Sequence, residues 1–168
     1  MKHVIRLAAV MSVAALALAI PAHSAFAAAP PDSSSTIPKL LNQVKQHASE
    51  ANHDAQLMES YRRSNVDFKT YAQALTNIKE HANDLFQDFY ALQRVRESGT
   101  PAQREAIDNL EPLLREMATS LTNTIQTLNT QKSEVNMPEF RKRVHADSMK
   151  IEAVYRHLCE CTSKNSKI

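Results

Sequence analysis

Apolar residues recur along the chain at spacings that alternate between three and four positions, in four separate stretches. On an α-helix this repeat gathers apolar side chains into one narrow stripe, which is typical of helices packed against each other. The pattern predicts helices over about 37–63, 66–98 and 101–129, and from 136 through 161. In chain order the stripes are formed by Ile37, Leu41, Val44, Ala48, Ala51, Ala55 and Met58; by Phe68, Tyr71, Leu75, Ile78, Ala82, Leu85, Phe89 and Leu92; by Ile107, Leu110, Leu114, Met117, Leu121, Thr124 and Leu128; and by Phe140, Val144, Asp147, Ile151, Val154, Leu158 and Cys161.

Residues that favour helix ends separate these stretches. Thr36 is predicted to cap the first helix, with Pro38 in its first turn, and Asn136 is predicted to cap the fourth. The clearest boundary is the run from Gly99 to Gln103, which combines a C-terminal glycine, a Thr cap, an initial proline and a capping-box glutamine. The second and third helices should therefore be joined by a very short turn.

Long helices joined by short connections must alternate in direction. The sequence therefore predicts an all-α fold, an up-down-up-down antiparallel four-helix bundle. The alternative is one continuous helix through Ser64 and Asn65, which would give an extended hairpin that dimerises. Ser64 followed by Asp67 resembles a helix cap, and it favours the break.

The N-terminus has the three parts of a secretory signal peptide. Lys2 and Arg6 precede an apolar run that is too short to span a membrane, and Ala25-Phe26-Ala27 forms a cleavage site. We therefore predict a signal peptide over 1–27, a disordered lead-in over 28–35, the bundle over 36–163 and a flexible tail over 164–168. The mature protein should have no integral membrane span, and it should be exported to a bacterial periplasm or secreted.

Composition excludes several classes of function. Gly99 is the only glycine, which excludes glycine-rich phosphate-binding loops and the nucleophile elbow of α/β-hydrolases. Loss of Lys2 and Arg6 with the signal peptide leaves 18 of the 20 basic residues to balance 18 acidic residues. A neutral mature chain gives no reason to expect nucleic-acid binding. No catalytic constellation is recognisable, so the sequence predicts a protein that is not an enzyme.

The short turns predict which residues of antiparallel neighbours share a height along the bundle. Aligned in this way, each helix has a small residue at one height, and we call this set the small-residue waist: Ala48, Ala82, Ala118 and Ser148. Polar and sulfur-containing side chains lie within a turn of that height: His47, His81, Asp147, Met117 and Met149.

Two interpretations of the waist are open. In the first, the small residues allow close helix packing, Asp147 turns outward to a basic partner, and the histidines face solvent. In the second, the missing side-chain volume is a cavity whose carboxylate, imidazole and thioether groups bind a metal ion or haem. A ferritin-like di-iron site needs two Glu-x-x-His motifs on different helices. The chain has one such motif, Glu50-x-x-His53, and its His53 falls on the outer face.

Cys159 and Cys161 raise the question of a disulfide in an oxidising compartment. Positions i and i+2 point in different directions on a helix, so the two thiols cannot join while the helix holds. A strained bond after fraying, a disulfide-linked dimer through Cys159, and two reduced thiols remain as alternatives. His157 and Cys161, at i and i+4, could also share a soft metal ion.

Basic residues gather where the first two helices and the last two helices are joined. We call this set the basic pole: Arg62, Arg63, Lys69, Lys132, Arg141, Lys142 and Arg143. Such a run is usually a solvated helix end, and its functional interpretation is docking on an anionic envelope surface.

Together these features predict a non-enzymatic exported protein that acts by binding, either to a protein partner or to an anionic cell-envelope component. The alternative is a periplasmic metal or haem carrier that uses the waist.

Overall fold

The computed structural model describes residues 33–64 and 66–165, which form four long α-helices. They are α1 (Ser33–Tyr61), α2 (Phe68–Val95), α3 (Pro101–Thr130) and α4 (Pro138–Asn165). Two short 3₁₀ helices, η1 (Arg96–Ser98) and η2 (Lys132–Glu134), lie in the connections. The predicted signal peptide lies outside the described residues, as do positions 28–32 of the predicted lead-in and positions 166–168 of the predicted tail.

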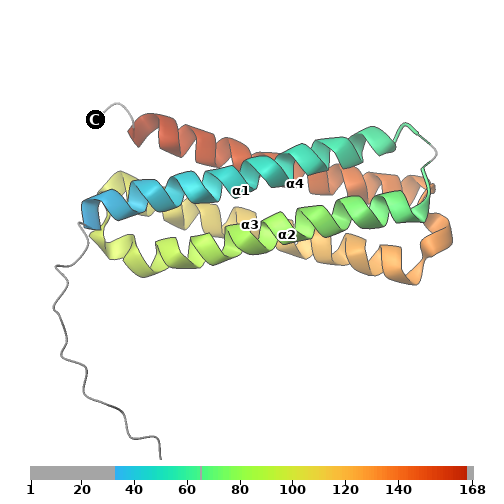
Figure 1. Cartoon of the computed structure of the whole chain (residues 1–168), viewed down its shortest axis with the longest axis horizontal. Helices are drawn as coiled ribbons and strands as arrows, with labels where there is room; N and C mark the ends of the chain where they lie inside the picture. The colour runs from blue at the N-terminus through green and yellow to red at the C-terminus, as the bar shows by residue number, and fades with distance from the viewer. Residues whose placement is uncertain (1–32, 65, 166–168) are drawn as a thin grey trace, which may run out of the picture.

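The helices run side by side in alternating directions and form an antiparallel four-helix bundle (Figure 1). The α1–α2 and α3–α4 connections meet at one end, and the α2–α3 connection lies at the other. The predicted fold is therefore confirmed, and α1 and α2 are separate helices. None of the four described helices combines the length and the apolar composition needed to cross a membrane.

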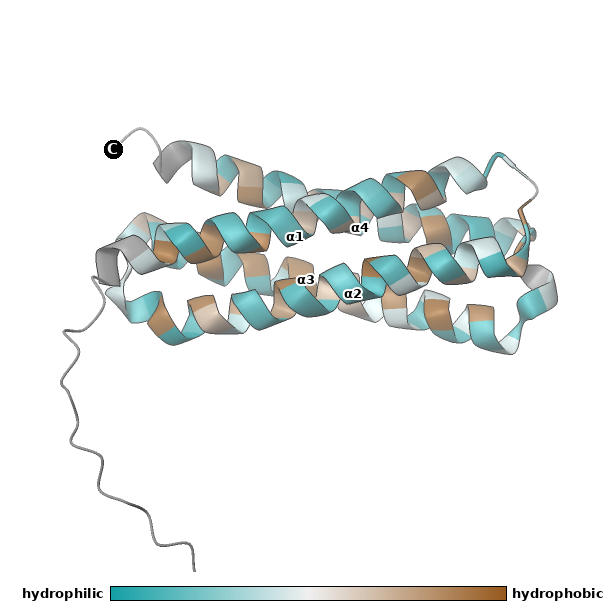
Figure 2. Cartoon of the chain, in the orientation of Figure 1, coloured by the Kyte–Doolittle hydropathy of each residue, from teal (hydrophilic) through white to brown (hydrophobic). Residues whose placement is uncertain are grey.

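The apolar stripes face each other inside the bundle, and polar residues cover its outside (Figure 2). Every predicted stripe position is buried except Phe68 and Cys161, which are half-buried. The core also includes Ala74 and Val135, which the repeat did not predict. Burial of these long stripes holds the fold together, because each fully buried aliphatic side chain contributes about 1.5–3 kcal/mol.

The α2–α3 connection differs from the prediction in the role of its glycine. Gly99 ends η1 with a φ of −80°, so it does not adopt the left-handed conformation of a helix-terminating glycine. A Cβ atom at Gly99 would lie 2.9 Å from Ile37 Cδ1. A larger residue at this position would therefore require the buried Ile37 side chain to shift. The predicted Thr100–Gln103 capping box is present.

Three helix starts also differ from the prediction. α1 begins at Ser33, so the last residues of the predicted lead-in are helical and Pro38 lies inside the helix. α2 is capped by Asp67, which accepts a hydrogen bond from the Thr70 amide at 2.9 Å. α4 begins at Pro138, and the Met137 carbonyl accepts from the Arg141 amide at 3.2 Å. Met137 therefore stands at the cap position predicted for Asn136. At its other end, α4 includes the first two residues of the predicted tail.

Candidate metal site

The small-residue waist does not form at one height. Ser148 Oγ donates to the Ala55 carbonyl at 2.7 Å, which puts Ser148 two turns from Ala48. Ala118 lines a surface groove of about 390 Å³ with Phe86 and Phe89. The predicted alignment fails in the α1–α2 and α2–α3 pairs. His47 contacts Asp88 and Arg96 pairs with Asp108, each several residues from the pairing that the turns predicted.

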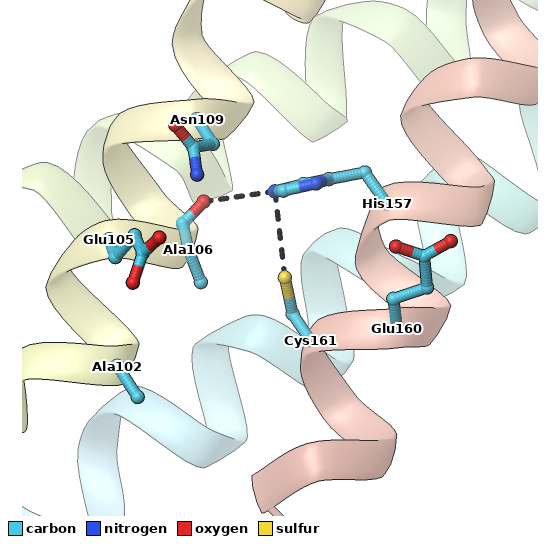
Figure 3. A pocket seen from close by; sticks show the side chains of 7 residues that line it. All are labelled: Ala102, Glu105, Ala106, Asn109, His157, Glu160 and Cys161. Carbon is cyan, nitrogen blue, oxygen red and sulfur yellow. Dashed lines mark hydrogen bonds between the residues drawn. The ribbon is translucent and has the colours of Figure 1, made fainter.

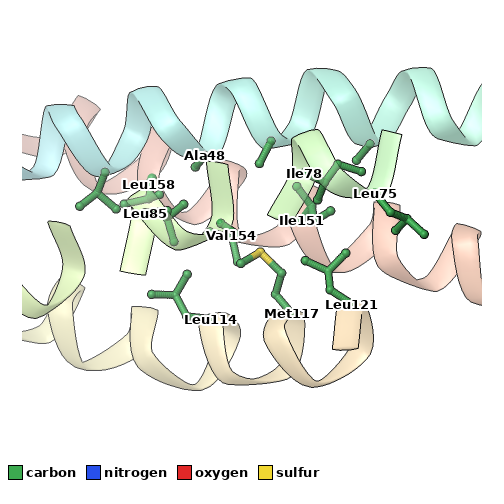
Figure 4. Packing of buried hydrophobic residues seen from close by; sticks show 14 of the residues in the cluster. Ala48, Leu75, Ile78, Leu85, Leu114, Met117, Leu121, Ile151, Val154 and Leu158 are labelled. Carbon is green, nitrogen blue, oxygen red and sulfur yellow. The ribbon is translucent and has the colours of Figure 1, made fainter. Parts of the chain in front are cut away.

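Large side chains fill the space that the waist was predicted to leave. His47 contacts Asp88 and Glu50 contacts His81, which puts Ala48 at the height of Leu85 rather than of Ala82. Figure 4 shows the Met117 and Val154 side chains meeting in the middle of the bundle near that height. Met117 is therefore a core residue, whereas Met149 is exposed on the outside of α4.

Asp147 is fully buried between α4 and α3, and it does not turn outward as the first interpretation of the waist predicted. Its Oδ1 accepts a hydrogen bond from Ser120 Oγ at 2.5 Å, while its Oδ2 has no hydrogen-bond partner in the described part of the chain. Burial raises the pKa of the carboxyl, although the Ser120 hydrogen bond and the nearby Thr124 hydroxyl oppose the shift. The predicted grouping of Asp147 with the two histidines does not occur, since its contacts are on α3.

The structure does bring His47 and His81 together, on either side of Glu50 in the groove between α1 and α2. His47 Nδ1 and His81 Nδ1 each lie 3.3 Å from Glu50 Oε2. The other ring nitrogens face acidic residues: His47 Nε2 is 3.5 Å from Asp88 Oδ2, and His81 Nε2 is 3.5 Å from Asp54 Oδ2. We call these five residues the histidine–carboxylate cluster.

Helical spacing explains how this cluster assembles. Glu50 follows His47 by three positions, so the two share one face of α1, and Asp54 lies one turn further on. Asp88 follows His81 by seven positions, or about two turns of α2. Antiparallel packing of α1 on α2 then alternates acids and imidazoles across the groove.

The electrostatic environment keeps Glu50 ionised. The Gln46 amide donates to Glu50 Oε1 at 3.2 Å, and this hydrogen bond lowers the pKa of Glu50 most. Burial raises that pKa, but the adjacent His81 and His47 lower it further, and the net pKa lies below the ordinary value. Glu50 therefore offers a carboxylate oxygen between two imidazole nitrogens at neutral pH.

His47, Glu50 and His81 each provide one ligand atom, and these atoms all lie within 4.8 Å of one another. Two ligands of a tetrahedral zinc ion, each about 2.0–2.1 Å from the metal, are about 3.3 Å apart. The separation of Glu50 Oε2 from each histidine Nδ1 equals that value. The three side chains can therefore hold a metal ion with small movements and leave one coordination position open.

Asp54 and Asp88 complete the chemistry of a metal site. A histidine that binds a metal through Nδ1 carries its proton on Nε2, and a carboxylate partner there fixes the ring. Asp88 Oδ2 is buried and makes no hydrogen bond within the described residues, so such a proton would satisfy it. Both histidines were predicted from the sequence, but these two acids were not. Their acidic side chains recur at helical spacing beside the apolar stripes, and this pattern could have identified them.

The two cysteines are not joined by a disulfide, and both are half-buried. Cys161 Sγ lies 3.5 Å from His157 Nε2, and the same nitrogen is 3.1 Å from the Ala106 carbonyl (Figure 3). These residues border a pocket of about 270 Å³ between α3 and α4. Because His157 Nε2 donates to a carbonyl, it has no lone pair free for a metal ion in this arrangement.

The basic pole is assembled as predicted at the end where α1 meets α2 and α3 meets α4. Arg62 pairs with Glu59 at 2.6 Å, and Lys142 pairs with Glu139 at 2.8 Å. Lys132 Nζ lies 5.1 Å from the ring centre of Phe68. Arg63, Lys69, Lys132 and Arg143 are exposed and form no ion pair within the described residues.

Comparisons with protein-family models, with curated proteins and with solved structures found no match to this chain. A functional proposal therefore follows from the residues of the chain itself.

Proposed function

We propose that this protein is an exported, non-enzymatic metal-binding bundle that holds one divalent transition-metal ion at His47, Glu50 and His81. The observation that supports this function most directly is the shared position of Glu50 Oε2, 3.3 Å from Nδ1 of each histidine. Export, as predicted from the N-terminal sequence, would expose this site to metal ions outside the cytoplasm.

The ligand set favours zinc, copper or nickel over calcium or magnesium. Imidazole nitrogen is a typical ligand of the first group, whereas calcium and magnesium bind oxygen ligands in larger number. Haem does not fit between the two histidines, because both rings contact the same carboxylate oxygen.

Exposure of the site favours an exchangeable ion over a permanently buried one. The side chains of His47, His81 and Glu50 are 27%, 30% and 39% exposed. Water can therefore reach the fourth position, and a donor from another molecule could replace that water. These properties suit the uptake and transfer of an ion.

Isothermal titration of the exported protein with zinc chloride tests the proposal, after its processed N-terminus has been verified by mass spectrometry. We expect one bound ion per chain, and affinity that falls on acidification because the histidine nitrogens must be deprotonated to bind. His81→Ala and Glu50→Gln should each weaken binding at least tenfold.

His53→Ala is the matched control, since His53 is an exposed histidine on the same helix. It should leave the affinity unchanged. Absence of stoichiometric binding in the unaltered protein, or an equal loss in His53→Ala and His81→Ala, would contradict the proposal. Circular dichroism of each variant separates loss of the site from loss of the fold.

A further inference from the structure

The basic pole combines two features that the metal site does not explain. They are exposed cations that form no ion pair with a described residue, and an exposed apolar side chain. The sequence places seven basic residues there with four acidic ones, Glu59, Asp67, Glu134 and Glu139. Three of these acids have structural roles, since Glu59 and Glu139 pair with basic residues and Asp67 caps α2. The exposed cations therefore create a positive surface on a chain whose mature net charge is zero.

Met137 projects from the same end, in the connection that joins η2 to α4. It is 54% exposed and stands at the cap position of α4, where a polar side chain would satisfy the free amides of the first turn. Methionine there gains neither a capping hydrogen bond nor burial. Val135, two residues earlier, is only 4% exposed and holds the connection against the core.

Aromatic packing gives this end a fixed shape. The ring of Tyr71 lies edge-on to Tyr61 at 6.0 Å and to Phe140 at 5.1 Å, which ties the end of α1 and the starts of α2 and α4 together. Lys132 over the Phe68 ring ties η2 to α2 in the same way. These contacts lie at the end of the bundle where the α1–α2 and α3–α4 connections meet (Figure 1).

We propose that the basic pole docks end-on on a bilayer that contains anionic phospholipid. Exposed Lys and Arg side chains attract anionic headgroups, and an apolar side chain among them can enter the boundary between headgroups and acyl chains. An anionic polymer would offer the charge but no apolar layer for Met137, so the methionine favours a bilayer. The proposal is independent of metal binding at the α1–α2 groove, which lies nearer the middle of the bundle.

Vesicle co-sedimentation of the exported, processed protein tests the docking. We expect binding to vesicles of phosphatidylglycerol and phosphatidylcholine at low salt, at least tenfold weaker binding to phosphatidylcholine alone, and at least tenfold weaker binding at high salt. Lys132→Glu with Arg143→Glu should reduce binding at least tenfold, and Met137→Asp should reduce it several-fold.

The chain offers a matched control for each change. Met149 is exposed to a similar extent, 51%, but on the side of α4, so Met149→Asp should bind as the unaltered protein does. Lys79→Glu with Arg156→Glu reverses two exposed charges on the sides of the bundle and should cause a smaller loss.

The proposal would be overturned if the protein did not bind anionic vesicles at low salt, or if binding were equal at low and high salt. Equal losses of binding in the test and control variants would also overturn it. If Met137→Asp binds vesicles as well as the unaltered protein does, and a soluble anionic polymer competes for binding, the surface would be assigned to a polymer instead.

Discussion

The α1–α2 groove and the α3–α4 contact both place acidic side chains beside the apolar core, but they satisfy them in different ways. In the groove, three carboxylates alternate with two imidazoles, and water reaches all five residues. Between α3 and α4, Asp147 is fully buried, and its carboxyl accepts a hydrogen bond from the Ser120 hydroxyl. A single buried carboxyl favours its neutral form and is poorly suited to a cation, whereas the groove keeps a carboxylate charged and accessible.

Both regions rest on buried leucines, and truncating these should destabilise the protein most. Leu85 lies beneath the groove and Leu121 lies one residue from Ser120, and both are buried. Leu85→Ala and Leu121→Ala should each lower the free energy of unfolding by about 2–5 kcal/mol, because each leaves a cavity in the core. Urea unfolding measures this, and a loss below about 0.5 kcal/mol would mean that the position is not buried.

Substitutions in the two regions should differ in their effect on zinc affinity. Asp88→Asn removes the carboxylate that faces His47 Nε2, and loss of such an outer partner typically weakens metal binding about 10–100-fold. Asp147→Asn makes the same chemical change between α3 and α4 and should leave zinc affinity unchanged. Titration calorimetry of both variants tests the distinction, which fails if the two affinities change equally.

The pH dependence of stability should also differ. The pKa of Asp147 is raised in the folded protein, so its contribution to stability is full below the ordinary aspartate pKa and is lost as pH rises through the raised value. Asp147→Asn mimics the neutral form, so its stability should rise relative to that of the unaltered protein on going from pH 4 to pH 8.

Urea unfolding of both proteins at the two pH values measures this difference. Acids whose pKa is lowered in the fold, such as Glu50 and Asp108, make stability rise with pH. Both proteins contain these acids, so their contribution cancels in the difference between the two stabilities. A difference that does not change with pH would show that Asp147 is charged in the fold.

The smallest effect is expected in the groove without metal. Glu50 is partly exposed, so its contacts with the histidines resemble surface ion pairs, which contribute about 0–1 kcal/mol. Glu50→Gln should therefore change the stability of the metal-free protein by less than about 1 kcal/mol. A larger loss in chelator-treated protein would indicate that the cluster is structural and does not need an ion.

The sequence predicted the helices and nearly all core positions because burial follows directly from the apolar repeat. It did not predict which residues of different helices share a height, since that depends on how many residues each turn uses. Ala118 lines a surface groove with Phe86, and the Ser148 hydroxyl donates to the Ala55 carbonyl. Both histidines of the candidate site were named, but their carboxylate partner is Glu50, one turn from His47, and not the distant Asp147.

Gly99 has a consequence for following the molecule in solution. A Cβ atom at Gly99 would meet Ile37 Cδ1, so the turn between α2 and α3 packs directly against the beginning of α1. Ser98 beside it is exposed and can carry a fluorescent dye. Such a dye would lie beside the first turns of α1 and would report their detachment from this turn.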